Sequence, residues 1–203
     1  MYSDFSNIPD IRPGITAVIG SGGKTTLIKK ASERLSGTVL LTTSTHIFPF
    51  DDVPLYTGDD ISELQELLRA ERVVCVGTPA AGGKLTKPDI AFHKLAALAD
   101  YVLVEADGSK HLPLKAHASF EPVIPEGTNS VIWVIGASGF NRPVCEVVHR
   151  PEIFCDVMQV TPETPVTEQM YRDFVRWEIE NHPLIHLYAD PQKLSIYIRS
   201  SLL

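Results

Sequence analysis

The sequence predicts an α/β domain in three layers, with helices on both faces of a mainly parallel central sheet. Short, apolar, β-branched runs alternate with helical patterns along the 203 residues. This alternation is typical of parallel strands joined by crossover helices. Hydrophobic residues make up 44% of the chain and charged residues 21%, which suits a domain that buries a full core. We therefore expect a single domain over residues 1–203, with residues 1–13 as an N-terminal extension.

The first half of the chain carries strong strand and helix signals in alternation. Strands are expected at 16–19, 38–42 and 73–76, and a first helix at 24–35. Asp60-Ile61-Ser62-Glu63 is a capping box that predicts a helix with Leu64, Leu67 and Leu68 on one face. A glycine-rich connection is expected at 78–84. A second box, Thr86-Lys87-Pro88-Asp89, predicts a helix that carries Ile90, Leu95 and Leu98.

The second half continues the pattern with strands expected at 101–105 and 131–135. A helix is expected at 165–179, and it would place Met170, Phe174 and Trp177 on one stripe facing the core. Residues 184–188 are expected to form the last strand, and Asp190 to cap a final helix through Arg199. Irregular insertions are expected at 44–58 and 106–128.

Charge and composition exclude several classes of function. The net charge is −7 and no basic run occurs, which argues against a nucleic-acid surface. Residues 1–12 lack the basic start and apolar stretch of a signal peptide. No uninterrupted apolar segment approaches the ~20 residues needed to span a bilayer. We expect a cytoplasmic protein that binds neither nucleic acid nor membrane.

The three cysteines are Cys75, Cys145 and Cys155, and none belongs to a Cys-x-x-Cys pair. Their spacing indicates neither a disulfide framework nor a zinc site. We expect buried apolar thiols. The seven histidines form no metal-binding tract.

The segment 15–26 predicts a phosphate-binding loop. An apolar strand stops at Gly20-Ser21-Gly22-Gly23, and Lys24-Thr25-Thr26 then opens a helix. Glycines let successive N–H groups turn toward an anion, and the helix N-terminus adds partial positive charge. We expect Lys24 to reach the β- and γ-phosphates and Thr25 to hold Mg²⁺. A full Walker A motif would have glycine where this chain has Val18, and a glycine-rich turn with a solvated lysine is the alternative.

The strand 101–105 ends in Glu105, and Asp107 follows two residues later. In P-loop folds a second apolar strand beside the first delivers a carboxylate near Mg²⁺ or near the attacking water. Alternate residues of an extended chain face the same side, so both carboxylates are candidates for metal binding and catalysis. The sequence leaves open which carboxylate has which role, and whether both are solvated turn residues.

Hydroxyl groups end the second strand in Thr42-Thr43-Ser44-Thr45-His46. Ligands bind at the carboxyl ends of parallel strands, so Thr43 is a candidate Mg²⁺ ligand and His46 a candidate γ-phosphate contact. A structural threonine run is the alternative.

Lys110, His111 and Lys115 follow the acidic strand end and would suit a small anionic substrate or a developing phosphoryl charge, and His149-Arg150 is a second, weaker candidate of the same kind. The alternative interpretation, that these side chains are ordinary solvated charges of a loop, is equally well supported. Thr86-Lys87-Pro88-Asp89 also spells a guanine-recognition pattern, but in P-loop GTPases that element follows the acidic strand, whereas here it precedes Glu105. The helix-cap interpretation is preferred. ATP is therefore the expected nucleotide, with GTP left open.

Several segments in the same order resemble one family. They are Gly20-Ser21-Gly22-Gly23-Lys24-Thr25-Thr26, Thr42-Thr43-Ser44-Thr45-His46-Ile47, Val104-Glu105-Ala106-Asp107-Gly108-Ser109-Lys110, Leu112-Pro113-Leu114-Lys115-Ala116, Glu121-Pro122-Val123-Ile124-Pro125 and Val148-His149-Arg150-Pro151-Glu152. Together they resemble the selenium-dependent hydroxylase accessory proteins of the YqeC family over most of residues 15–155. The compact loop is also similar to that of Mur ligases and folylpolyglutamate synthetases.

The resemblance implies a P-loop nucleotide-binding protein tied to maturation of selenium-dependent molybdenum hydroxylases. It supplies no reaction, and it does not extend over the last fifty residues. One expectation is a Mg²⁺-dependent NTPase or phosphotransferase with Lys24, Glu105 and Asp107 as its catalytic residues. The alternative is a nucleotide-gated delivery protein that binds a partner of the maturation pathway. A Mur-like ligase is a third, weaker hypothesis, because such an enzyme normally requires a further C-terminal domain.

Overall fold

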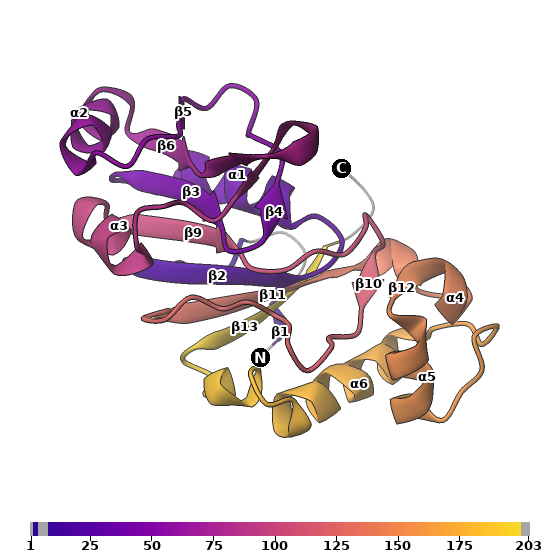
Figure 1. Cartoon of the computed structure of the whole chain (residues 1–203). Coiled ribbons are helices and arrows are strands. Elements are labelled where there is room, and N and C mark those ends of the chain that lie inside the picture. Colours follow the sequence, from indigo (N-terminus) through magenta and orange to yellow (C-terminus); the bar gives the residue numbers. More distant parts are fainter. Residues whose placement is uncertain (1, 4–7, 200–203) are drawn as a thin grey trace.

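The computed structural model describes residues 2–3 and 8–199 of the chain. Its centre is an eight-stranded sheet in which every pair of neighbouring strands is parallel. Figure 1 shows this sheet running through the molecule. In spatial order the strands are β1 (Tyr2–Ser3), β13 (Leu194–Arg199), β11 (Ser130–Gly136), β2 (Gly14–Gly20), β9 (Tyr101–Glu105), β3 (Val39–Thr43), β6 (Val73–Val76) and β5 (Leu55–Tyr56).

Two small sheets lie beyond the main one. An antiparallel sheet joins β4 (His46–Ile47), β8 (Lys84–Thr86) and β7 (Thr78–Ala80). A parallel pair joins β10 (Leu114–Lys115) to β12 (Val148–His149). These short ladders fix the segments that follow β3 and β9, and both segments reach the candidate site described below.

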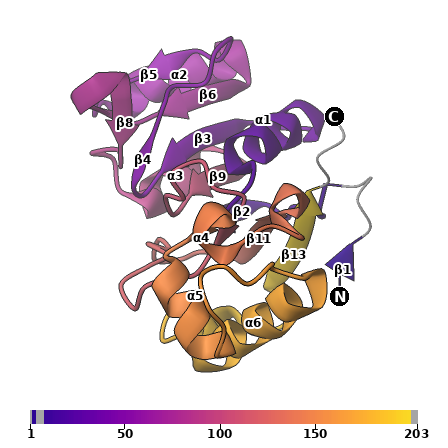
Figure 2. The same ribbon diagram turned by 90° about the vertical axis from the view of Figure 1, so that its right-hand side faces the viewer.

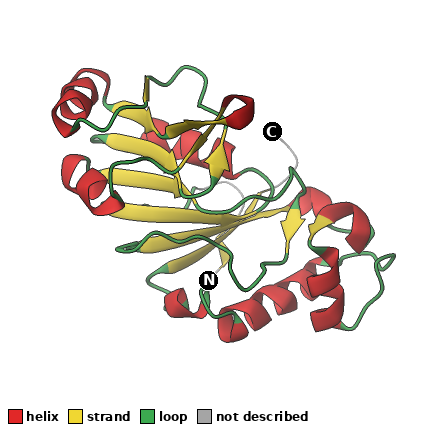
Figure 3. Ribbon diagram, in the orientation of Figure 1, coloured by secondary structure: helices red, strands yellow, loops and turns green. Residues whose placement is uncertain are grey.

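The helices are α1 (Lys24–Arg34), α2 (Ile61–Glu71), α3 (Phe92–Leu98), α4 (Val144–Val147), α5 (Pro151–Met158) and α6 (Glu168–Asn181), with 3₁₀ turns η1 (Ala81–Gly83), η2 (Ala137–Gly139) and η3 (His186–Tyr188). Figure 2 shows α4, α5 and α6 gathered beside β11 and β13, and Figure 3 separates these helices from the strands by colour. Within the described residues, none of these helices has the length and apolarity needed to cross a bilayer.

Alternation along the strands assigns the helices to the two faces of the sheet. Val18 on β2 belongs to the apolar cluster that contains α1. Its neighbour Ala17 points to the opposite face, into the cluster formed with α6. Ile15 shares that second face and belongs to the cluster that contains α2 and α3. Among the described helices, α1 therefore packs on one face of the sheet, and α2, α3 and α6 pack on the other, which confirms the predicted three-layer α/β fold of the P-loop NTPase type.

Most strong local signals predicted the correct element. The strands at 73–76 and 101–105 have the predicted bounds. The first helix begins at Lys24, and the expected helix at 165–179 is α6, shifted by two or three residues. Asp60 caps α2 by accepting hydrogen bonds from the backbone N–H groups of Ser62 at 2.7 Å and Glu63 at 3.4 Å.

Three element predictions were wrong. Residues 186–188 form η3 rather than a strand, and 194–199 form β13 rather than a helix. Here the sheet overrides the local signal, because β13 pairs with β11 along six residues. The box at Thr86 does not cap a helix either. Thr86 pairs with Thr78 and His46 in the small antiparallel sheet, and α3 begins later, after Ala91.

Two burial predictions also needed correction. Phe174 lies in the core as predicted, but Trp177, one helical turn away, is 41% exposed. Cys75 is buried, and burial raises the pKa of its thiol to about 11. Cys155 is half-buried and Cys145 is exposed, so the prediction of a buried thiol is wrong at Cys145. Trp177 lies on α6 and Cys145 on α4. The periodic pattern of a helix does not reveal which positions at the edge of its apolar face are exposed to solvent.

Candidate functional site

The turn between β2 and α1 has the shape that its glycines predict. Gly22 and Gly23 have φ values of +85° and +119°, a region that L side chains rarely adopt. A Cβ atom on Gly22 would lie 2.5 Å from the Cα atom of Gly136. The chain therefore needs glycine at position 22 both for its conformation and for the close approach of a neighbouring backbone.

Lys24, the first residue of α1, turns back beneath this loop and is only 4% exposed. Its Nζ donates a hydrogen bond to the carbonyl oxygen of Gly20 at 2.7 Å, and it lies 2.9 Å from Asp107 Oδ1 and 3.8 Å from Glu105 Oε1. Burial acts to lower the pKa of Lys24, but the carboxylates of Asp107 and Glu105 outweigh it and raise that pKa. Lys24 is thus a charged, fixed group, and the alternative of a solvated lysine is wrong.

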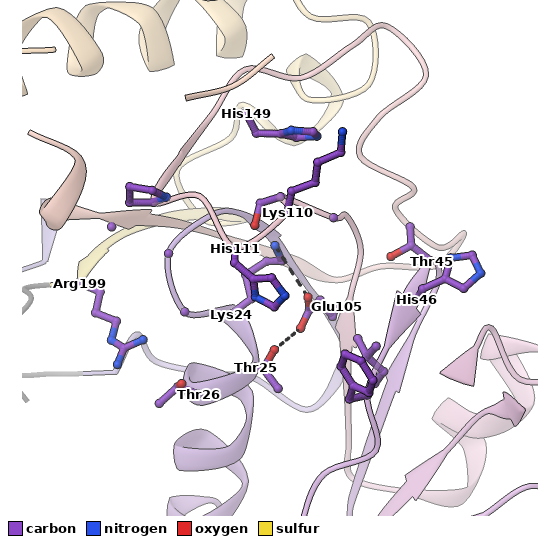
Figure 4. Close-up of a pocket in the computed structure, with 18 of the residues that line it drawn as sticks. Lys24, Thr25, Thr26, Thr45, His46, Glu105, Lys110, His111, His149 and Arg199 are labelled. Carbon is purple, nitrogen blue, oxygen red and sulfur yellow. Dashed lines mark hydrogen bonds and ion pairs between the residues drawn. The ribbon is translucent and has the colours of Figure 1, made fainter. Parts of the chain in front are cut away.

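Thr25 and Glu105 meet at the edge of the loop. The Thr25 hydroxyl donates a 2.8 Å hydrogen bond to Glu105 Oε2 (Figure 4). Burial raises the pKa of Glu105, and the charge of Lys24 opposes this shift. A hydroxyl and a carboxylate side by side are hard oxygen donors of the kind that Mg²⁺ binds together with phosphate oxygens.

These oxygens fit Mg²⁺ only as part of a larger ligand set. Among the residues that the structure describes, no group of three His, Cys, Asp or Glu side chains is arranged to hold a metal ion. Because Mg²⁺ is usually held by one or two carboxylates together with substrate phosphates, the donors here suit an ion that arrives with a polyphosphate.

Asp107 lies below the loop rather than in front of it. The carboxylate is fully buried. It accepts hydrogen bonds from the Gly20 N–H at 2.8 Å and from His117 Nε2 at 2.9 Å, and it lies 3.3 Å from Lys115 Nζ. Burial acts to raise the pKa of Asp107, but Lys24, His117 and Lys115 hold that pKa well below its usual range. Asp107 therefore supports the loop and Lys24 from beneath.

A buried histidine extends this network toward the C-terminal helices. His117 Nδ1 lies 2.9 Å from Glu178 Oε2, and the His117 backbone N–H donates to Glu178 Oε1 at 2.7 Å. Glu178 lies on α6 and is fully buried. Burial acts to lower the pKa of His117, but the two carboxylates outweigh it and raise that pKa. Sequence reasoning missed both residues, and the available signal was the charged Glu178 on the otherwise apolar stripe of a predicted helix.

The loop opens into a cleft of about 1120 Å³ at the carboxyl ends of β2, β9, β3 and β11. The main lining residues from the loop are Gly22, Gly23, Lys24, Thr25 and Thr26, and Glu105 follows from β9. Thr45, His46, Ile47, Phe48 and Lys84 line one flank, and Gly136, Ser138 and Arg199 line the other. The remaining wall is formed by Gly108, Ser109, Lys110, His111, Pro113, Glu121, Arg142, His149 and Arg150.

The hydroxyl cluster after β3 is divided between structure and cleft. Thr43 is buried, and its hydroxyl donates to the Glu105 carbonyl oxygen at 2.8 Å while accepting from the Thr45 N–H at 2.9 Å. Thr43 is therefore already used in joining β3 to β9. Thr45 and His46 line the cleft instead.

The two lysines after the acidic strand end have different environments. Lys110 is exposed and lines the cleft, as an anion-binding group would. Lys115 is fully buried, and its Nζ donates to the Gly108 carbonyl oxygen at 2.7 Å and lies 3.1 Å from Glu121 Oε2. The structure thus places Lys115 outside the cleft, among the supports of the loop.

The fold brings together several cleft residues that no strong sequence motif marks. Arg150 holds Glu121 through two contacts of 3.1 Å, one from Nε and one from Nη2. On the flank beside β8, the Lys84 ammonium lies 5.2 Å from the ring centroid of Phe48. Arg199 at the end of β13 lies against Gly23. These residues come from five separate parts of the chain, and no local motif joins them.

Comparison with known proteins identifies relatives of this chain. The family model described as "YqeC protein" matches residues 16–152. The "Uncharacterized protein YqeC" of Escherichia coli (strain K12) is 35% identical over 162 residues, which cover 75% of this chain and 63% of that protein. This aligned region thus spans less than two thirds of the relative's length. No solved structure matches the chain. The family match includes the glycine loop, Glu105 and the wall as far as Arg150, and this chain is therefore a member of the YqeC family.

Proposed function

We propose that this protein binds a nucleoside triphosphate with Mg²⁺ in the cleft and acts as a Mg²⁺-dependent NTPase or phosphotransferase. The observation that carries the proposal is the meeting of three groups at one point: the left-handed glycine loop, the buried Lys24 ammonium and the Thr25–Glu105 pair. Backbone N–H groups, one ammonium and one metal-binding pair are the recurring parts of phosphoryl-transfer sites.

The proposed roles follow from the contacts. Residues 22–26 line the cleft and hold the phosphates, with Lys24 at the β- and γ-phosphates. The N–H groups of Gly20 and Ser21, which the sequence also offers for phosphate binding, already donate to Asp107 and to the Val134 carbonyl oxygen. Thr25 and Glu105 hold Mg²⁺, which neutralises phosphate charge when bound. Asp107, which the sequence offers as a second catalytic carboxylate, acts through Lys24 and Gly20 and is a positioning residue. ATP is the proposed nucleotide, and GTP is the competing one.

The biological role that we propose is accessory to maturation of selenium-dependent molybdenum hydroxylases. This proposed role rests on family membership together with the resemblance of the motifs, because no contact in the cleft identifies a pathway. A small anionic substrate bound near Lys110 and His46 fits the same proposal.

A thermal-shift experiment with ATP, GTP, ADP and GDP, each with Mg²⁺, tests the nucleotide proposal. A ligand at 100 times its dissociation constant adds about 2.7 kcal/mol to the free energy of unfolding. We expect that gain in the wild type and in Lys30→Ala, whose exposed lysine lies on α1 away from the loop. We expect no gain in Lys24→Ala. Equal stabilisation of Lys24→Ala and Lys30→Ala would remove the proposal.

A nucleotide-gated delivery protein is the second candidate, and the buried network favours it. The contacts run from Lys24 through Asp107 and His117 to Glu178 on α6, without a solvent gap. A phosphate that draws Lys24 away from Asp107 would alter the charges facing His117, and so the packing of α6. Pull-down of maturation partners with and without AMP-PNP separates the two functions, because capture of a partner by a switch protein depends on the nucleotide.

A further inference from the structure

The cleft is larger and more basic than a phosphate loop alone requires. Its volume of about 1120 Å³ slightly exceeds the ~300–1,000 Å³ that typically hold one small ligand. Six lysine and arginine side chains line it, and Glu105 and Glu121 are the carboxylates among its described lining residues. This excess of cations occurs in a chain whose net charge is −7. The charge is thus concentrated at the cleft, as expected for a polyanionic ligand.

One group of these cations lies on the wall away from the loop. Figure 4 shows Lys110 and His149 together on this wall, separated from Thr25 and Thr26. Burial is the main cause that lowers the pKa of His149. The positive charges of neighbours that include Arg150 and Lys110 lower this pKa further. The imidazole is therefore a neutral hydrogen-bond donor and acceptor that lies among cations.

The wall is fixed by its own contacts and is not a loose surface loop. The β10–β12 ladder pairs Lys115 with His149, and the Ala116 N–H donates to the His149 carbonyl oxygen at 3.0 Å. Arg150 is oriented by Glu121, which is in turn paired with the buried Lys115. Its guanidinium also lies 5.3 Å from the ring centroid of Phe120.

The backbone of this wall is strained at three positions. Lys110, His111 and Arg150 have φ values of 49°, 62° and 67°. Non-glycine residues rarely adopt this region, and they persist there where surrounding contacts impose the conformation. Lys110 has no carboxylate partner within the described part of the chain, so its ammonium is available to a ligand.

We propose that Lys110, His149 and Arg150 form a second anion-binding subsite, which takes the phosphate of a phosphomonoester that shares the cleft with the nucleotide. An ammonium, an imidazole and a guanidinium supply enough donors for a dianion with several oxygens. This inference rests on the proposed function in one respect, because it assigns residues 22–26 to the nucleotide. It specifies the second substrate as a small phosphorylated molecule.

Titration calorimetry with inorganic phosphate as the probe tests the subsite. The full chain is first saturated with AMP-PNP and Mg²⁺, and phosphate replaces chloride at constant ionic strength. We expect one phosphate to bind, and we expect Lys110→Ala and His149→Ala each to weaken that binding about tenfold. Lys94→Ala, which removes an exposed lysine of α3 outside the cleft, is the matched control and should bind phosphate like the wild type.

A second titration separates this inference from the nucleotide proposal. Lys24→Ala without nucleotide, checked for folding by circular dichroism, should still bind one phosphate, and adding Lys110→Ala should weaken that binding about tenfold. If AMP-PNP fails to bind the wild type, this titration still measures the second subsite. Absence of phosphate binding in both backgrounds, or binding that Lys110→Ala and His149→Ala leave unchanged, would overturn the inference.

Discussion

Asp107 supports the glycine loop between β2 and α1 through its contacts with the Gly20 N–H and Lys24 Nζ. It has no exposure to solvent, yet it stays charged, because four groups surround it: the Gly20 N–H, Lys24, Lys115 and His117. An isolated buried carboxylate would become protonated, whereas here the pKa is held well below its usual range. The charge of Lys24 is balanced from beneath, while Gly22 and Gly23 line the cleft above it.

Replacing Asp107 with asparagine should therefore destabilise the fold. The amide keeps the size of the side chain but removes the charge that balances two buried ammonium groups. Breaking a buried pair in this way costs about 3–5 kcal/mol, and urea unfolding measures it. Asp89→Asn, at an exposed position, is the control and should change the free energy of unfolding by less than about 0.5 kcal/mol. Similar unfolding midpoints for the two variants would contradict the role given to Asp107.

His117 should make stability depend on pH. Asp107 and Glu178 hold its two ring nitrogens, and the rings of Trp133 and His182 face it. The folded-state pKa is raised above the ordinary value of 6.5. Protonated His117 therefore stabilises the fold fully below about pH 6.5, and this contribution is lost as the pH rises through the folded pKa.

The comparison of wild type with His117→Gln isolates that contribution. We expect the difference in their free energies of unfolding to be largest near pH 6 and to shrink as the pH rises toward 9. Urea unfolding at several pH values measures the difference, and an NMR titration of the His117 ring gives the pKa directly. A difference that stays constant with pH would show that His117 is not protonated in the folded protein.

Among the elements, those with strong local signals were predictable from the sequence and those defined by distant partners were not. The strand 101–105 is a continuous apolar run, and its bounds were correct. Residues 194–199 were predicted as a helix because Asp190 resembles a cap, but Asp190 instead accepts from the Gln192 N–H in a turn. The strand there exists because β11 offers an open edge, which no local pattern reveals.

The same distinction applies to the candidate site. Its loop and Glu105 are motif residues and were found from the sequence, and the structure brings them together. The supports His117 and Glu178 lie 61 residues apart and meet only in the fold. His149 and Arg150 were weaker candidates in the sequence, and only the fold brings them to the cleft with Lys110. Lys115 was taken for a substrate residue because burial cannot be read from a short charged loop.

The N-terminal cap of α2 allows the contribution of one hydrogen-bonding side chain to helix stability to be tested. Asp60 satisfies two backbone N–H groups at the start of the helix, while the neighbouring Asp59 makes no such contact within the described residues. Asp60→Ala should lower the free energy of unfolding by about 1 kcal/mol. Asp59→Ala, which removes the same charge one residue earlier, should leave it nearly unchanged. Thermal or urea unfolding measures both, and equal losses would indicate a charge effect rather than a cap.

At the scale of the whole molecule, the buried contacts around Asp107 and His117 connect the two helices α1 and α6, which pack on opposite faces of the sheet. Lys24 begins α1 on one face of the sheet, while Glu178 lies on α6 on the opposite face. Asp107 and His117, which follow β9, lie between them and contact both sides. A change at the glycine loop therefore has a continuous physical path to the C-terminal helices.

Hydrogen–deuterium exchange measures whether that path couples the two regions. Binding of AMP-PNP and Mg²⁺ should draw Lys24 toward phosphate and change the amide protection of α6, residues 168–181, as well as that of the loop. Glu178→Gln keeps the side-chain size but removes the carboxylate that faces His117, so nucleotide should protect its loop while leaving α6 unchanged. Glu180→Gln, an exposed change on the same helix, is the control and should respond like the wild type. Protection of α6 that is the same with and without nucleotide in the wild type would rule out coupling through this path and would favour a plain enzyme over a nucleotide-gated delivery protein.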